Sequence, residues 1–244
     1  MQDNVTANRL PEISLKDFKY FGEKPIAGWL NVNGLLSLAG IIGPIVLLIT
    51  DLIAARSAAV NHYSLVRDSI SLLAWMPMGW IQTIGFLTIG LLVEIFAAGL
   101  FLNIRLSKGF GFGILLLVLF GFGLLMIGAF HTDIPGRENT IDGLIHGLAA
   151  KTVFWLLPVA NLFITPSLKN DSRWRPLFSY SIAIALFALV WMIIYQFWLS
   201  ENLTWFGLYE RILVVSEVLW VELMAIWSLR LSLRGQAEHH LEHS

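Results

Sequence analysis

The stretch Phe110–Phe130, FGFGILLLVLFGFGLLMIGAF, contains 21 residues and no charged side chain. A hydrocarbon core about 30 Å thick is crossed by roughly 20 helical residues that rise 1.5 Å each. The run is continuously apolar, whereas the strands of a membrane barrel alternate apolar and polar residues with a period of two. The stretch is therefore predicted to be a membrane-spanning helix.

Five further stretches are similar in length and mostly apolar, although four of them contain charged residues. They are Leu35–Ala55, Trp80–Leu102, Gly143–Ile164, Phe178–Leu199 and Tyr209–Leu229. Because 57% of the residues are apolar and only 14% are charged, the chain has too little polar surface for a water-soluble domain. We predict an all-α fold, a polytopic transmembrane bundle of six helices over residues 35–231. Residues 1–34 are predicted to rest on the membrane surface as an N-terminal segment, and residues 232–244 to form a C-terminal tail.

The basic residues predict the orientation of this bundle. Eleven Lys and Arg side chains fall on the side of the two termini, and the opposite side holds Arg56, Arg67, Arg137 and Arg211. Cytoplasmic loops carry an excess of Lys and Arg, so both termini are expected in the cytoplasm and the protein in the cell membrane. Between the first two spans, residues 61–75 show a helix-like pattern and are predicted to form a short interfacial helix on the outer face.

The net charge and the missing cysteines exclude several functions. A net charge of −1 argues against nucleic acid as a partner, because phosphate binding requires a basic face. The chain has no cysteine, which excludes disulfides, thiolate catalysis and iron–sulfur clusters. The expected partners are membrane lipids and other membrane subunits. Four-residue spacings of Gly109 with Gly113 and of Gly143 with Gly147 predict close helix packing at these sites.

Polar residues gather in the predicted outer loops. Asp68, Glu210 and Arg211 are the candidates for catalysis, with Asp68 as a general base and Arg211 binding an anionic group. Three others, His131, Asp133 and His146, could hold a zinc ion that acidifies a bound water. The alternative is a structural network in which the arginine satisfies the carboxylates and the histidine bonds within the bundle. No cofactor is predicted beyond this zinc alternative.

A second set of ionisable residues lies within the spans, where a charge requires a partner or a purpose. Lys151 and Glu217 fall at the same depth and are predicted to pair, with Asp51 as the other candidate partner of Lys151. Glu94 and Glu222 also share a depth. If they are adjacent, the two carboxylates could share a proton or bind a cation; otherwise each is protonated or bonded to a neighbouring helix.

Short polar islands between the spans resemble those of the domain of unknown function 998 family. They are Tyr63-Ser64, Ser69-Ile70-Ser71 with Leu73, Thr132-Asp133, Gly143 with His146, and Glu210-Arg211. The resemblance covers residues 35–231. It implies a six-helix fold with a polar cluster at the outer end, and it implies no particular activity.

Three functions remain as hypotheses. The first is a protein that binds a lipid or small apolar ligand, or an accessory subunit of a membrane complex, and it fits the lack of a catalytic signature. The second is an outward-facing, metal-dependent hydrolase acting on a lipid or another interfacial substrate. The third is a proton- or cation-coupled carrier that uses Glu94 and Glu222. We rank them in this order.

Overall fold

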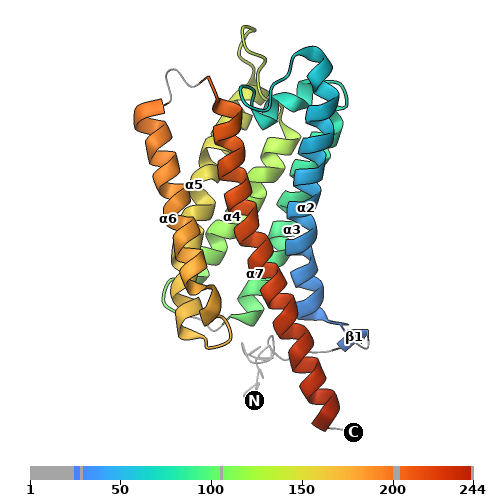
Figure 1. The fold of residues 1–244 in the computed structure, drawn as a ribbon, viewed down its shortest axis with the longest axis vertical. Helices are drawn as coiled ribbons and strands as arrows, with labels where there is room; N and C mark the ends of the chain where they lie inside the picture. Colours follow the sequence, from blue (N-terminus) through green and yellow to red (C-terminus); the bar gives the residue numbers. More distant parts are fainter. Residues whose placement is uncertain (1–24, 28–29, 105–106, 200–203, 243–244) are drawn as a thin grey trace, which may run out of the picture.

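The computed structural model describes residues 25–27, 30–104, 107–199 and 204–242. Most of this part of the chain lies in six helices that are long and apolar enough to cross a membrane (Figure 1). They are α2 (Val32–Ala58), α3 (Gly79–Asn103), α4 (Phe110–Ala129), α5 (Ile141–Asn170), α6 (Phe178–Ile194) and α7 (Phe206–Glu242). The prediction of six apolar helices is confirmed, and the chain is a multi-pass membrane protein.

Smaller elements connect or precede these helices. Strands β1 (Pro25–Ala27) and β2 (Leu30–Asn31) form an antiparallel pair just before α2, while residues 1–24 of the predicted surface segment lie outside the described part. The loop after α2 contains the 3-10 helices η1 (Ala59–Asn61) and η2 (Ile70–Trp75), the latter where an interfacial helix is predicted. The 3-10 helix η3 (Arg175–Leu177) precedes α6, and one π-helical turn, η4 (Tyr195–Leu199), follows it.

Side chains and glycines set several helix ends. The Asn31 side chain accepts from the Gly34 amide at the start of α2, and Thr140 does the same for Gly143 at the start of α5. These bonds satisfy amides that have no partner within the helix. Gly109 precedes α4 with φ +89°, a conformation that other residues avoid because of their Cβ atom. Capping side chains and a glycine with positive φ therefore mark the starts of α2, α4 and α5.

The helices form a ring in which α2 packs on α3 and α7, α4 packs on α3 and α5, and α6 packs on α5. Contacts between α6 and α7 are fewer, and they include hydrogen bonds of Ser181 with Trp220 and Met224 as well as aromatic stacking near the upper end of α7. Tyr209 of α7 stacks on Tyr195 at 4.5 Å and on Trp191 at 5.5 Å between ring centroids. The ring is thus closed more loosely between α6 and α7 than elsewhere.

Glycines bring α3 and α4 together. A Cβ atom on Gly90 would lie 2.8 Å from the Gly121 carbonyl oxygen, and one on Gly121 would lie 2.9 Å from the Gly90 oxygen. Gly113 likewise faces α5, since its Cβ would lie 3.0 Å from the Ala160 oxygen, as its spacing predicts. By contrast, no atom of the described part of the chain lies within 4 Å of a Cβ atom built on Gly147, so the predicted close packing there is wrong.

Candidate functional site

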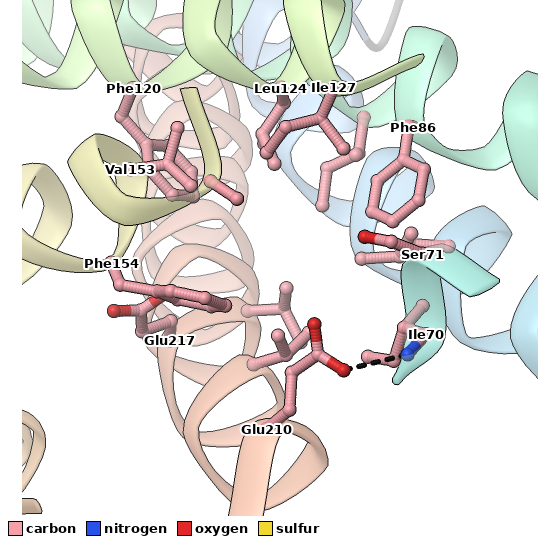
Figure 2. Close-up of a pocket in the computed structure, with 15 residues that line it drawn as sticks. Ile70, Ser71, Phe86, Phe120, Leu124, Ile127, Val153, Phe154, Glu210 and Glu217 are labelled. Carbon is pink, nitrogen blue, oxygen red and sulfur yellow. Dashed lines mark hydrogen bonds between the residues drawn. The ribbon is translucent and has the colours of Figure 1, made fainter. Parts of the chain in front are cut away.

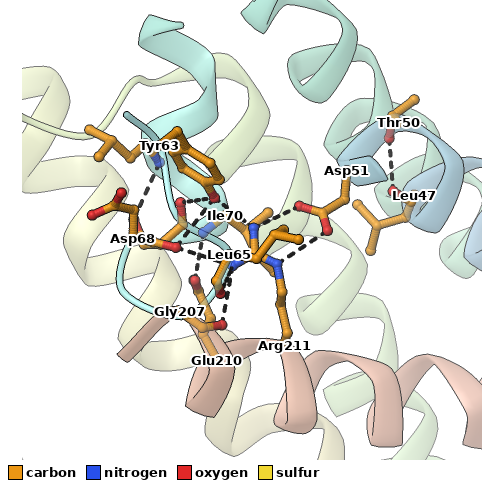
Figure 3. A network of polar contacts seen from close by, with 12 residues as sticks. Leu47, Thr50, Asp51, Tyr63, Leu65, Asp68, Ile70, Gly207, Glu210 and Arg211 are labelled. Atoms are coloured by element: carbon orange, nitrogen blue, oxygen red, sulfur yellow. Dashed lines mark hydrogen bonds and ion pairs between the residues drawn. The ribbon is translucent and has the colours of Figure 1, made fainter. Parts of the chain in front are cut away.

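Arg211, in the second turn of α7, ties three segments together at the end of the bundle that holds η2, which we call the upper end (Figures 1 and 3). Its Nε and Nη2 donate to the two carboxylate oxygens of Asp51 in α2, at 3.3 and 3.1 Å. Nη2 also donates to the Tyr63 hydroxyl at 2.6 Å. Nη1 donates to the carbonyl oxygens of Leu65, Asp68 and Gly207. Every nitrogen of the guanidinium is therefore engaged by the protein itself.

Tyr63 links Arg211 to the loop between α2 and α3. Its hydroxyl accepts from Arg211 and donates to the Ser69 carbonyl oxygen at 2.9 Å. Burial raises the pKa of this hydroxyl above its ordinary value, so the group stays protonated and remains a donor. The amides of Gly207 and Leu208 at the start of α7 donate in turn to the carbonyl oxygens of Arg67 and Val66. The loop thus satisfies the exposed amides of the helix start.

Asp68 holds the loop in shape. Its Oδ1 accepts from Nε of Arg67 at 2.8 Å, and its Oδ2 accepts from the Ser64 amide at 2.8 Å. The hydrogen bonds from Arg67 hold the pKa of the Asp68 carboxyl below its ordinary value of 3.8. Both oxygens of the predicted general base are therefore occupied by contacts within the loop.

This lowered pKa predicts a pH dependence of stability. A carboxyl whose pKa is lower in the folded state stabilises the fold at neutral pH, and this contribution is lost as the pH falls through the folded pKa. We expect Asp68→Asn to lower the unfolding temperature at neutral pH, and the difference from the unmodified protein to shrink below pH 3.8. Thermal unfolding followed across pH measures this. A difference that stays constant with pH would show that the charge of Asp68 contributes nothing.

Glu210 joins the same loop to α7 on the side that faces the interior of the bundle. Its side chain is buried, and Oε2 accepts from the Ile70 amide at 2.6 Å, which fixes the start of η2 to α7 (Figure 2). The structure therefore brings the three predicted catalytic residues, Asp68, Glu210 and Arg211, to one place together with Asp51 and Tyr63. We call these five residues the loop–helix cluster. Their contacts join the loop to α2 and α7, which agrees with the alternative hypothesis that these residues form a structural network.

The three predicted metal ligands have separate partners. Nδ1 of His146 lies 2.8 Å from the Phe130 carbonyl oxygen, which only accepts, so this nitrogen is the donor. Asp133 Oδ1 accepts from the Thr140 amide and hydroxyl, and His131 packs against the Trp75 ring at 5.4 Å. Within the described residues, no group of three or more His, Asp and Glu side chains is arranged to hold a metal ion. The donors needed for a zinc site at His131, Asp133 and His146 are thus not gathered.

The predicted pairing of Lys151 is wrong. In the described part of the chain the ion pairs are Arg67–Asp68, Arg173–Asp171 and Arg211–Asp51, so Asp51 belongs to Arg211. Lys151 is exposed, whereas Glu217 is buried, and its Oε1 has no hydrogen-bond partner among the residues that the structure describes. Equal depth did not place the two side chains on facing sides of their helices.

Glu94 and Glu222 belong to α3 and α7, and both are half-buried. Glu94 lies against α4, since a Cβ atom on Gly121 would be 2.8 Å from its Cγ. The two helices make only limited contact because α2 packs between them. No contact between the two carboxylates is recorded among the described residues, so their adjacency stays a prediction.

A small cavity of about 40 Å³ lies at the centre of the ring (Figure 2). Glu210, Glu217 and Ser71 line it together with apolar side chains of five helices, among them Phe86, Phe120 and Val153. A volume of this size holds a few water molecules at most. The central cavity is therefore too small for an organic ligand.

A wide cavity of about 790 Å³ lies beside it, bounded by α5, by the end of α6 with η4, and by the start of α7. It opens on the surface, because Lys151, Thr152 and Gln196 are exposed among its lining residues. Glu210 and Phe154 line both cavities. The loose closure of the ring between α6 and α7 thus leaves room for a ligand of substantial size.

A known protein family matches most of this chain. The family model described as "Protein of unknown function (DUF998)" matches residues 41–227, most of the chain. This chain is a member of the DUF998 family. No curated protein and no solved structure matches it at a significant level.

In this DUF998 protein three of the five polar islands of the sequence converge in space. Hydrogen bonds at the upper end join the Tyr63-Ser64 and Ser69-Ile70-Ser71 islands to each other and to Glu210-Arg211, which is far away in the chain (Figure 3). The implied six-helix fold is confirmed. The polar cluster is present as well, while its position on the outer side of the membrane stays a prediction.

Several residues around the wide cavity of the DUF998 protein were missed by the sequence reasoning. They are mostly apolar or aromatic residues of spans four to six, such as Phe154, Trp155, Tyr195 and Tyr209, and such residues look alike whether they face lipid or a cavity. One signal was available, because Gln196 is an amide within an otherwise apolar run. Polar residues inside a span point to a cavity or to a neighbouring helix.

Proposed function

We propose that this protein binds an amphiphilic lipid or small apolar ligand in the wide cavity, at the outer end of the bundle. The size of the cavity supports this, because ligand sites commonly measure about 300–1,000 Å³ and the cavity measures about 790 Å³. Aromatic and aliphatic side chains make up much of its lining. A bilayer supplies ligands of this kind directly through the opening between α5 and η4.

The order of residues along α5 supports an amphiphile in particular. In the first part of the cavity-lining segment the side chains include His146, Lys151 and Thr152. Further along α5, away from the upper end, they are Trp155, Leu156 and Val159. A ligand with a polar head and an apolar tail matches this change. The proposal depends on one observation, the wide cavity whose lining along α5 is polar near the upper end and apolar further away from it.

Gly147 allows a direct test. It lines the wide cavity, and no atom of the described residues lies within 4 Å of a Cβ atom built there, so the side chain of Gly147→Phe starts in open space and occupies part of the cavity. We expect Gly147→Phe to abolish ligand binding while the unfolding temperature stays the same or rises, since glycine is a poor helix residue. Native mass spectrometry of the purified protein measures co-purified small molecules.

Gly111→Phe is the matched control for this test. Gly111 also has open space around a Cβ atom, but it lies on α4 and does not line the wide cavity. We expect Gly111→Phe to retain the bound molecule. Equal occupancy in Gly147→Phe and the unmodified protein would refute binding in the wide cavity.

A further inference from the structure

Lys151 is a charged residue that does not belong to the loop–helix cluster. It lies ten residues after the start of α5, or about 15 Å along the helix axis. Its side chain is exposed and lines the wide cavity. The ion pairs found among the described residues join other side chains. An ammonium group at this depth is costly unless an anion accompanies it, and such residues commonly mark a ligand site.

The other ionisable residues that line the wide cavity leave its accessible charge positive. Glu210 is only 6% exposed, and one of its oxygens is held by the Ile70 amide. His146 is 5% exposed and bonds to the Phe130 carbonyl oxygen through Nδ1. Lys151 is therefore the charged group that an incoming ligand meets first.

We infer that the ligand is a single-chain amphiphile with an anionic head group, a carboxylate or a phosphate, that pairs with Lys151. The inference rests on the proposed binding function and adds the chemical class of the ligand. The chain of such a molecule lies along Trp155, Leu156 and Val159, beyond Lys151 on α5. The amide of Gln196 lines the same cavity and adds a hydrogen-bond donor for the head group. The ammonium group supplies charge-assisted hydrogen bonds that a neutral head group cannot match.

The test compares three brominated probes with the same chain: a fatty acid, a monoacyl phosphate and a long-chain alcohol. The protein is held in phosphatidylcholine nanodiscs at a pH that ionises both acidic probes. Bromine quenches tryptophan on contact, and Trp155 lines the wide cavity. Trp155→Phe identifies the part of the quenching that comes from this site. Saturable quenching then gives the affinity of each probe.

We expect at least one of the two anionic probes to bind about tenfold or more tightly than the alcohol. Lys151→Gln should remove this preference and Lys151→Arg should keep it, because arginine retains the charge. Lys169→Gln, at the other end of α5 and outside the cavity, should leave it unchanged. The comparison of the fatty acid with the phosphate identifies the preferred head group.

The outcomes separate the two proposals. If the alcohol and both anionic probes bind equally well, the anionic head group is refuted while the binding function stands. If the preference survives in Lys151→Gln, Lys151 does not bind the head group. If none of the three probes gives saturable quenching that depends on Trp155, the binding function itself fails.

Discussion

Replacing Arg211 by methionine is expected to lower the free energy of unfolding by about 3–5 kcal/mol, the cost of leaving a buried charge without its partner. The side chains of Arg211 and Asp51 are only 13% and 12% exposed. The substitution also removes the donor to Tyr63 and to three carbonyl oxygens. Reversible unfolding in mixed micelles measures the loss.

Two further variants separate this effect from a general loss of positive charge. Arg67→Met also breaks an ion pair, but the Arg67 side chain is 61% exposed, so a small fraction of the loss is expected. Asp51→Asn in the Arg211→Met background removes the uncompensated carboxylate and should restore part of the stability. If Arg211→Met and Arg67→Met have equal effects, Arg211 does not hold the loop–helix cluster together.

Gly121→Leu is the second substitution with a large expected effect. A side chain at this position would meet the Gly90 carbonyl oxygen and the Glu94 side chain within 3 Å, and the backbone atoms cannot move aside without separating α3 from α4. Overpacking of this kind costs about 1–3 kcal/mol, and we expect the upper end of that range. The same unfolding assay applies.

Gly111→Leu provides the control on the same helix. Open space surrounds a Cβ atom at Gly111, so leucine there should be neutral or should stabilise α4 by up to about 1 kcal/mol. Equal stabilities of the two leucine variants would mean that α3 and α4 do not approach through Gly90 and Gly121.

Hydropathy predicted the helices well because the membrane imposes a minimum apolar length. The predicted span Phe110–Phe130 differs by one residue from α4, which ends at Ala129. The final span was predicted to end at Leu229, whereas α7 continues to Glu242. Hydropathy detects the apolar part of a helix and not its polar extension.

The site was predicted only in part, because depth along a helix says nothing about which face a side chain occupies. Lys151 and Glu217 share a depth, yet one lines the wide cavity and the other the central cavity. Arg211 and Asp51 pair across helices at opposite ends of the chain, which only the packing of α7 on α2 reveals. Asp68, Glu210 and Arg211, which were selected from the sequence, lie together at the upper end, while their hydrogen-bond partners depended on the three-dimensional arrangement.

The most direct test of ligand binding in the wide cavity is photolabelling in membranes with a photoactivatable long-chain alcohol, followed by peptide mapping. A neutral probe reports on the cavity whatever the charge of the natural head group. Labelling is predicted to concentrate on the cavity-lining parts of α5 and η4, to compete with unlabelled alcohol, and to disappear in Gly147→Phe. Labelling spread over the lipid-facing surfaces of α2, α3 and α4, with no competition and no effect of Gly147→Phe, would contradict the proposed function.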